Sequence, residues 1–235
     1  MLNIHQHRLH LVQILKDIYS DRELAVNLGF KGGTAAMLFY GLPRFSVDLD
    51  FNLLDKNYAE KAYQKVRNII LKYGKIHDEA QKFFGDLLSL DYGSGERNLK
   101  IDISHREENY DEYEIKNFLG VGVRTMNISD MFAHKLVALL GRGELVNRDI
   151  FDCWYFMKQG TPINKQIVEI LSQKTFADYL QDCINMLEQP AKQSLLNGIG
   201  DLVDNDMKSF IRNKLQQETV FLLKSYQMFP LLKKS

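Results

Sequence analysis

The feature that most constrains the fold is a short run at 47–51, Val-Asp-Leu-Asp-Phe, in which apolar and acidic side chains alternate. Alternate residues of a strand point to opposite faces of its sheet. The run therefore predicts a strand that buries its apolar side chains and holds Asp48 and Asp50 side by side on the other face. Two carboxylates this close repel each other unless a cation lies between them. The simplest use of such a pair is to bind Mg²⁺, a hard ion that takes oxygen ligands and often brings a substrate phosphate with it.

A Gly-Gly-Thr sequence at 32–34 precedes this strand and opens an apolar helical segment that Gly41 and Pro43 end. Gly32 and Gly33 allow a tight turn in which backbone N–H groups meet a helix start, a natural cradle for phosphate oxygens. Each element alone has an ordinary structural interpretation, as a common turn or as a solvated edge strand. Joined in this order, they indicate phosphoryl or nucleotidyl transfer.

The motifs along the chain resemble those of the DNA polymerase β-type nucleotidyltransferase superfamily. The similarity rests on the Gly-Gly-Thr turn, an Arg-x-Ser-x-Asp-Leu-Asp-Phe run at 44–51, an Asp-x4-Lys motif at 130–135 and an Arg-Asp-x-x-Asp segment at 148–152. Within the superfamily the sequence is most similar to the AbiEii/AbiGii-type toxins, which are nucleotidyltransferase-like toxins of bacterial type IV toxin–antitoxin and phage-defence systems. The resemblance spans residues 24–156.

The resemblance implies an α+β fold. We expect a polymerase β-type mixed sheet flanked by helices over residues 1–126, followed by a helical domain over 127–235 that contributes to the nucleotide cleft. It also implies a third metal-binding carboxylate on a neighbouring strand. Asp102 matches that position, because residues 98–104 alternate as a strand does. On its own, an aspartate on the polar face of a strand is ordinarily just solvated.

By the resemblance, the candidate residues divide by the part of the reaction that each would serve. The predicted metal ligands are Asp48, Asp50 and Asp102, and Asp102 could also help to activate an attacking hydroxyl. The predicted nucleotide-binding residues are Gly32, Gly33, Thr34, Arg44, Ser46 and Lys135. Two bound Mg²⁺ ions would activate the attacking hydroxyl and neutralise the leaving pyrophosphate.

Three residues of the later motifs have competing interpretations. Lys135 could reach a triphosphate as a point charge, or it could be an ordinary exposed helix lysine. Asp149 could belong to the catalytic site and orient Lys135, or it could cap a helix and pair with Arg148. For Asp152, three residues further along the same helix face, we favour a structural role.

The implied reaction transfers a nucleoside monophosphate from an NTP to an acceptor, with RNA, and tRNA in particular, as the expected acceptor. A cognate antitoxin is the expected protein partner. Lys and Arg number 30 and Asp and Glu also 30, and the resulting neutral charge weakens the case for a broad nucleic-acid surface. Two alternatives therefore stay open: a nucleotidyltransferase for a small molecule or a protein, and a non-catalytic module that binds nucleotide or a partner.

Composition and patterning complete the predictions. Cys153 and Cys183 are too few and too widely separated for a disulfide framework or a zinc site. No signal pattern or membrane-spanning run is found, so we expect a cytoplasmic protein with no membrane partner. Residues 2–19 predict an amphipathic helix whose three histidines lie on the surface. Further helices are expected over 131–140, with Ser129 as N-cap, from Pro190, and over 206–227.

Overall fold

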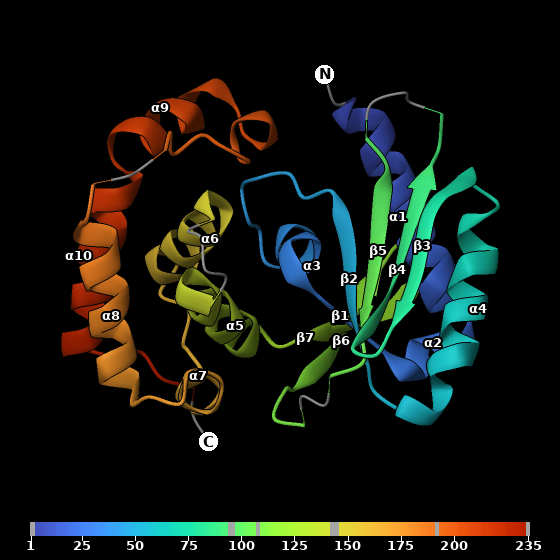
Figure 1. Ribbon diagram of the computed structural model, residues 1–235, viewed down its shortest axis with the longest axis horizontal. Coiled ribbons are helices and arrows are strands. Elements are labelled where there is room, and N and C mark those ends of the chain that lie inside the picture. Colours follow the sequence, from blue (N-terminus) through green and yellow to red (C-terminus); the bar gives the residue numbers. More distant parts are fainter. Residues whose placement is uncertain (1–2, 94–96, 107–108, 142–145, 191–192, 234–235) are drawn as a thin grey trace. The chain divides into compact units, whose positions relative to one another are not determined.

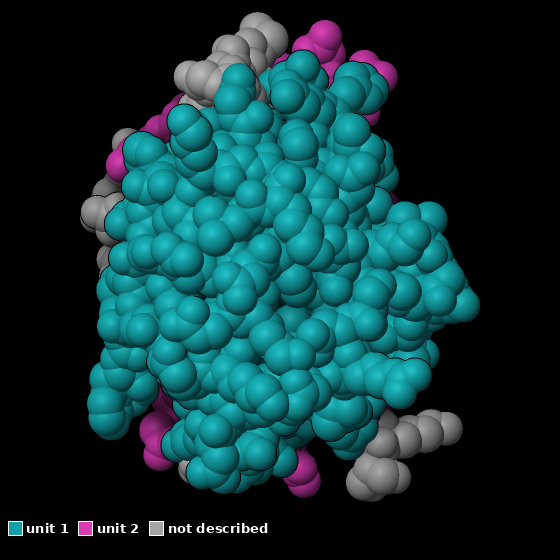
Figure 2. Space-filling view, turned by 90° about the vertical axis from the view of Figure 1, so that its right-hand side faces the viewer, with its two compact units in different colours: residues 1–41, 45–127 teal, residues 42–44, 128–235 magenta. Residues whose placement is uncertain are grey.

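The computed structural model describes residues 3–93, 97–106, 109–141, 146–190 and 193–233. The chain forms two compact units, coloured separately in Figure 2. Unit 1 comprises residues 1–41 and 45–127, and unit 2 comprises residues 42–44 and 128–235. In the described part of the chain, no helix is both long and apolar enough to span a membrane.

Unit 1 is built on a mixed sheet in which seven described strands follow the order β3-β4-β5-β2-β1-β7-β6. Strand β2 runs parallel to β5 and β1 parallel to β7, whereas the other neighbours are antiparallel. This topology confirms the predicted α+β mixed sheet. The strand bounds are β1 Leu28–Lys31, β2 Asp48–Leu53, β3 Lys75–Lys82, β4 Gly85–Asp91, β5 Leu99–Ser104, β6 Tyr113–Phe118 and β7 Val121–Met126.

Helices cover both faces of this sheet (Figure 1). Helices α1 (Ile4–Ser20), α2 (Arg22–Asn27) and α4 (Ala59–Ile70) lie on one face, and α3 (Gly32–Phe39) packs against β1 and β2 on the other. A short 3-10 turn, η1 (Lys56–Tyr58), leads into α4. Helix α4 forms because apolar residues recur every three or four positions, which gives it one buried face, made by Ala62, Tyr63, Val66, Ile69 and Ile70.

The histidines of α1 correct one prediction, because His7 is fully buried rather than on the surface. Its Nε2 lies 2.8 Å from the Val47 carbonyl oxygen, and its Nδ1 lies 2.7 Å from the Tyr92 hydroxyl. A carbonyl can only accept, so Nε2 carries the proton and Nδ1 accepts from Tyr92. The buried stripe of α1 runs through His7, Leu11 and Ile14, whereas Leu9 is exposed.

Unit 2 is helical, as predicted for the C-terminal region. Helix α10 packs against α6 and α8, and α5 packs against α6 and α7. The bounds are α5 Ile128–Gly141, α6 Asn147–Lys158, α7 Lys165–Ser172, α8 Phe176–Glu188, η2 Gly200–Leu202, α9 Asn205–Asn213 and α10 Leu215–Met228.

Three helix predictions in unit 2 are wrong in detail. The expected final helix is two helices, since the backbone leaves helical geometry at Lys214 (φ −133°) although no Gly or Pro marks the break. Helix α5 begins at Ile128, so Ser129 lies inside its first turn instead of capping it. No helix starts at Pro190, where the described residues 193–199 form turns.

Candidate functional site

The candidate site in unit 1 is organised by the register between β2 and β5. Asp50 lies directly opposite Asp102 in this parallel pair, and Asp48 lies opposite Lys100. Directly paired residues share a face of the sheet, so all three aspartates project from the same face. Leu49 and Phe51, on the opposite face of β2, are fully buried. The fold thus brings Asp102, from a distant part of the sequence, beside the Asp48–Asp50 pair.

Strand β1 adds a cation beside the carboxylates, since Lys31 is the direct partner of Asp50 on the other side of β2. Partial desolvation raises the pKa of the Asp102 carboxyl; Lys31 opposes this, and the charge of Asp48 adds to it. Asp102 therefore holds a proton more readily than an ordinary aspartate, because a like charge and a low-dielectric environment both disfavour its ionised form.

Gly32 brings the start of α3 against the Asp50 carboxylate. Its φ of +79° lies in the left-handed region, and a Cβ at this position would lie 2.1 Å from Asp50 Oδ2. Only glycine combines that backbone conformation with so close an approach. The two requirements explain why this turn needs glycine at position 32.

Thr34 joins the same helix start to β2. Its side chain is fully buried, and its hydroxyl donates to the backbone carbonyl oxygen of Asp48. Lys31, the residue before α3, makes no side-chain cap hydrogen bond in the described structure. The initial backbone N–H groups of a helix lack intrahelical partners, so those of Gly33 and Thr34 are the donors that this turn can offer to an anion. The hydroxyl of Thr34 has a structural partner instead.

Within the described ranges, no group of three or more His, Cys, Asp or Glu side chains is close enough to hold a metal ion. The donor chemistry nevertheless suits Mg²⁺, which is commonly held by one or two carboxylates together with substrate phosphates rather than by a complete protein cage. Asp50 and Asp102, paired across neighbouring strands, could supply such oxygens.

Arg44 and Ser46 lie on the loop that enters β2, and both are buried. The Arg44 guanidinium forms a bidentate ion pair with Asp152, with Nε 2.6 Å from Oδ1 and Nη2 2.7 Å from Oδ2. Both residues belong to unit 2. Arg44 therefore holds helix α6 and the 42–44 segment together, which is a structural role that the sequence did not reveal.

Lys135 joins Arg44 and Asp152 in one buried cluster of charged side chains. Its Nζ lies 3.0 Å from Asp152 Oδ2 and 3.5 Å from Asp149 Oδ1. Burial alone would lower the pKa of Lys135, but the two carboxylates outweigh it and hold the pKa above its ordinary value. The amine stays charged, and it is not the exposed helix lysine of the alternative interpretation, since its side chain is only 14% accessible.

Asp149 is the third residue of α6 and is not its cap, because Val146 precedes the helix and no side chain caps it. Asp149 contacts the Lys135 amine, and this contact is what the predicted orienting role requires. Asp152 has the structural role that the sequence favoured, because it is buried and pairs with Arg44. The spacing of three placed both aspartates on one helix face, but nothing in the sequence identified Arg44 as the partner.

Both the sequence and the fold are similar to those of known proteins. The sequence profile described as nucleotidyl transferase AbiEii toxin, type IV TA system, matches residues 13–225. A protein of H. pylori provisionally called a nucleotidyltransferase has a similar fold, with a TM-score of 0.58 at 19% identity over 96% of this chain and 98% of that one. JHP933 from Helicobacter pylori gives 0.55 at 20% identity over 97% and 96%. No curated protein matches the sequence.

Proposed function

The chain belongs to the family of AbiEii nucleotidyl transferase toxins of type IV toxin–antitoxin systems, and we propose that it transfers a nucleoside monophosphate from an NTP to RNA, with tRNA as the expected acceptor. The observation that carries the proposal is the direct pairing of Asp50 with Asp102, beside Asp48 and against the Gly32 turn. A module that only bound a partner would have no need of converging carboxylates at a phosphate-binding turn.

In the proposed arrangement Asp50 and Asp102, with Asp48 beside them, would hold Mg²⁺ together with the substrate phosphates. The backbone N–H groups of Gly33 and Thr34 would bind the phosphates. When bound, the metal lowers the pKa of the attacking hydroxyl and neutralises charge on the leaving pyrophosphate. Asp102 is the residue proposed to take the hydroxyl proton, because its carboxylate lies directly opposite Asp50 on the same face of the sheet.

The step itself is an in-line displacement at the α-phosphorus of the NTP. The acceptor hydroxyl oxygen forms a new bond to that phosphorus, and the bond to the pyrophosphate oxygen breaks. The products are the nucleotidylated acceptor, pyrophosphate and one proton, which leaves through Asp102. No oxidant or further reactant is required.

Lys135 and Asp149 take supporting roles in the proposal. The Lys135 amine would bind the triphosphate as a point charge, held in place by Asp149 and Asp152. Arg44 and Ser46, first expected to touch phosphate, are assigned no direct contact, because Arg44 is engaged with Asp152.

We further propose a cytoplasmic location, a cognate antitoxin as partner and a role in phage defence.

A small molecule or a protein remains the second candidate acceptor. The observation that favours it is the neutral overall charge, with 30 basic and 30 acidic residues. A nucleic-acid enzyme commonly carries a net positive field that steers its substrate. The chemistry at the carboxylates would be the same, so the two candidates differ only in what supplies the hydroxyl.

The test is incubation of the purified protein with Mg²⁺, each labelled NTP in turn, and total cellular RNA. Asp48→Ala is the control, because Asp48 is only half-buried and its loss should leave the fold intact. Label in a tRNA-sized band that is absent with the variant is the expected result. Label only in protein or small molecules would move the proposal to the second acceptor class. NTP binding without any transfer would refute catalysis.

A further variant separates Lys135 from the metal-binding residues. Lys135→Ala should raise the KM for the NTP more than it changes the dependence of the rate on Mg²⁺ concentration. If the KM for the NTP is unchanged, Lys135 has no contact with the triphosphate.

A further inference from the structure

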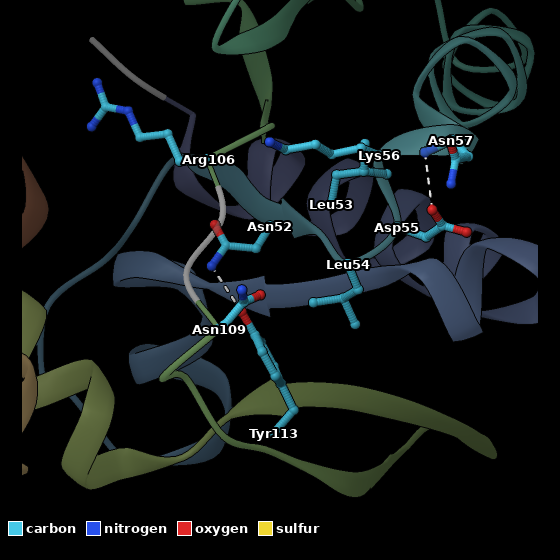
Figure 3. Close-up of a pocket in the computed structure, with 9 residues that line it drawn as sticks. All are labelled: Asn52, Leu53, Leu54, Asp55, Lys56, Asn57, Arg106, Asn109 and Tyr113. Atoms are coloured by element: carbon cyan, nitrogen blue, oxygen red, sulfur yellow. Dashed lines mark hydrogen bonds between the residues drawn. The ribbon is translucent and has the colours of Figure 1, made fainter.

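A cavity of about 360 Å³ opens in unit 1 where β2 ends (Figure 3). Its lining is mostly polar, with two cationic groups, the Asp55 carboxylate, several amides and one phenol hydroxyl. The side chains that matter here are Asn52, Lys56, Arg106, Asn109 and Tyr113. A volume of this order holds one nucleoside-sized ligand and excludes a duplex.

The cavity continues the carboxylate face of the sheet. Asn52 follows Asp50 by two residues and so shares its face, about 7 Å further along the strand. The Tyr113 ring lies over Gly29, where a Cβ would come within 2.2 Å of it. The Asn52 amide donates to the Tyr113 hydroxyl at 2.8 Å, and both side chains line the cavity (Figure 3).

The in-line geometry of the displacement places the acceptor at the Asn52 end of the carboxylates. Helix α3 starts against Asp50 and is bonded to Asp48 through Thr34, so the phosphate-binding turn lies toward the Asp48 end of β2. The attacking and leaving oxygens of a phosphoryl displacement lie on opposite sides of the phosphorus. With pyrophosphate leaving toward α3, the hydroxyl must arrive from the Asn52 end, where the cavity opens.

A second cavity, of about 450 Å³, shares Lys56 and Arg106 with the first and adds two aromatic rings. These are Phe83 and Phe84 at the tip of the β3–β4 hairpin, which are 88% and 60% exposed. The Arg106 guanidinium lies 5.7 Å from the centre of the Phe84 ring. Exposed rings beside cations are the arrangement by which proteins stack the bases and neutralise the phosphates of single-stranded nucleic acids.

We propose that these two cavities bind the single-stranded 3′ end of the RNA acceptor. The terminal nucleoside occupies the first cavity with its hydroxyl toward Asp50, and the preceding base stacks on Phe84. Lys56 and Arg106, common to both cavities, contact the phosphate that joins the two nucleotides. This inference rests on the proposed function, since it names the acceptor of the same site. No part is assigned to residues 107 and 108, which lie outside the described residues.

The test is a direct binding measurement that does not depend on transfer. A fluorescently labelled single-stranded oligoribonucleotide with a free 3′-hydroxyl is titrated with the full chain, without NTP, at several salt concentrations. The test variants are Lys56→Gln/Arg106→Gln and Phe84→Leu. The matched control is Lys61→Gln/Lys72→Gln, which removes the same charge from two lysines of unit 1 whose side chains are 57% and 63% exposed.

We expect Lys56→Gln/Arg106→Gln to weaken binding about tenfold or more. The magnitude of the slope of log K against log salt should fall by about 0.7, because the one phosphate that these two cations contact is no longer neutralised. Phe84→Leu should weaken binding about tenfold with the slope unchanged, since stacking carries no charge. The control should stay within twofold of the wild type. An equal loss in the control, no loss in the test variants, or equally tight binding of a blunt RNA duplex would overturn the inference.

Asp50→Asn separates a failure of this inference from a failure of the proposed function. It should lose transfer and still bind the oligoribonucleotide. If the binding pattern holds but the wild type transfers nothing, the site stands and the proposed reaction fails. If the wild type nucleotidylates RNA and Lys56→Gln/Arg106→Gln does so with an unchanged KM for RNA, the reaction stands and the acceptor site is wrong.

Discussion

The ion pair between Arg44 and Asp152 offers a quantitative test of how unit 2 is held together. Arg44→Met removes the guanidinium while keeping much of the side-chain volume. The cluster then contains Lys135, Asp149 and Asp152, and its formal charge falls from zero to −1. Asp152 is left fully buried, with the Lys135 amine at 3.0 Å but without the two bonds to Arg44.

Breaking a buried ion pair from one side costs about 3–5 kcal/mol. Because Lys135 continues to neutralise Asp152, we expect the lower end, about 3 kcal/mol in the free energy of unfolding of unit 2. The single tryptophan, Trp154, lies in α6 two residues from Asp152, so its fluorescence reports this unit directly. For a chain of this size, the urea midpoint should fall by about 1 M.

A double-mutant cycle and a pH series sharpen the test. Asp152→Asn added to Arg44→Met restores neutrality, so the double variant should be more stable than the sum of the single losses predicts, by about 1.5 kcal/mol. Burial alone would raise the pKa of Asp152, but Arg44 and Lys135 hold it below the ordinary value. The stabilisation is therefore complete above a pH of about 4 and is lost as the pH falls through the folded-state pKa. The cost of Arg44→Met should shrink over that acid range.

Two results would refute this account. One is a urea midpoint for Arg44→Met within error of the wild type. The other is strict additivity of the two single substitutions in the cycle, which would mean that the contact carries no coupling energy.

Three further outcomes are expected. Gly32→Ala should abolish transfer and cost about 1–2 kcal/mol of backbone strain. Gly93→Ala, at φ +83° with no atom of the described residues within 4 Å, should cost the same strain and leave activity intact. Equal activities of the two variants would exclude a close approach of Gly32 to Asp50. Asp102→Asn should raise the free energy of unfolding at neutral pH by about half a kcal/mol. The reason is that the pKa of Asp102 is raised, so its charged form is disfavoured in the folded state. In thermal unfolding experiments this gain should vanish below a pH of about 4. Burial lowers the pKa of His7 despite its hydrogen bond to Val47. The free energy of unfolding should therefore fall as the pH drops below about 6.5. His7→Gln should weaken this pH dependence in urea titrations between pH 7 and 5.

The amino-acid sequence alone determined the local elements of the candidate site. Alternation at 47–51 and 98–104 predicted two strands with apolar faces buried and acidic faces outward, and both strands are present. This works because a strand's two-residue period is visible in a few consecutive residues. The Gly-Gly-Thr turn was equally local, since a left-handed residue at a helix start requires glycine.

Only the tertiary structure decided which of these elements meet. The pairing of Asp50 with Asp102 depends on the register of two strands that are distant in sequence. Arg44 and Asp152 lie 108 positions apart, so no local pattern links them. The buried His7 was misplaced for a related reason. A histidine within an amphipathic period predicts a surface position unless the fold supplies a carbonyl and a hydroxyl for its two nitrogens, as Val47 and Tyr92 do here. Periodicity specifies which side of an element is buried, whereas partner and register follow from the packing of the whole chain.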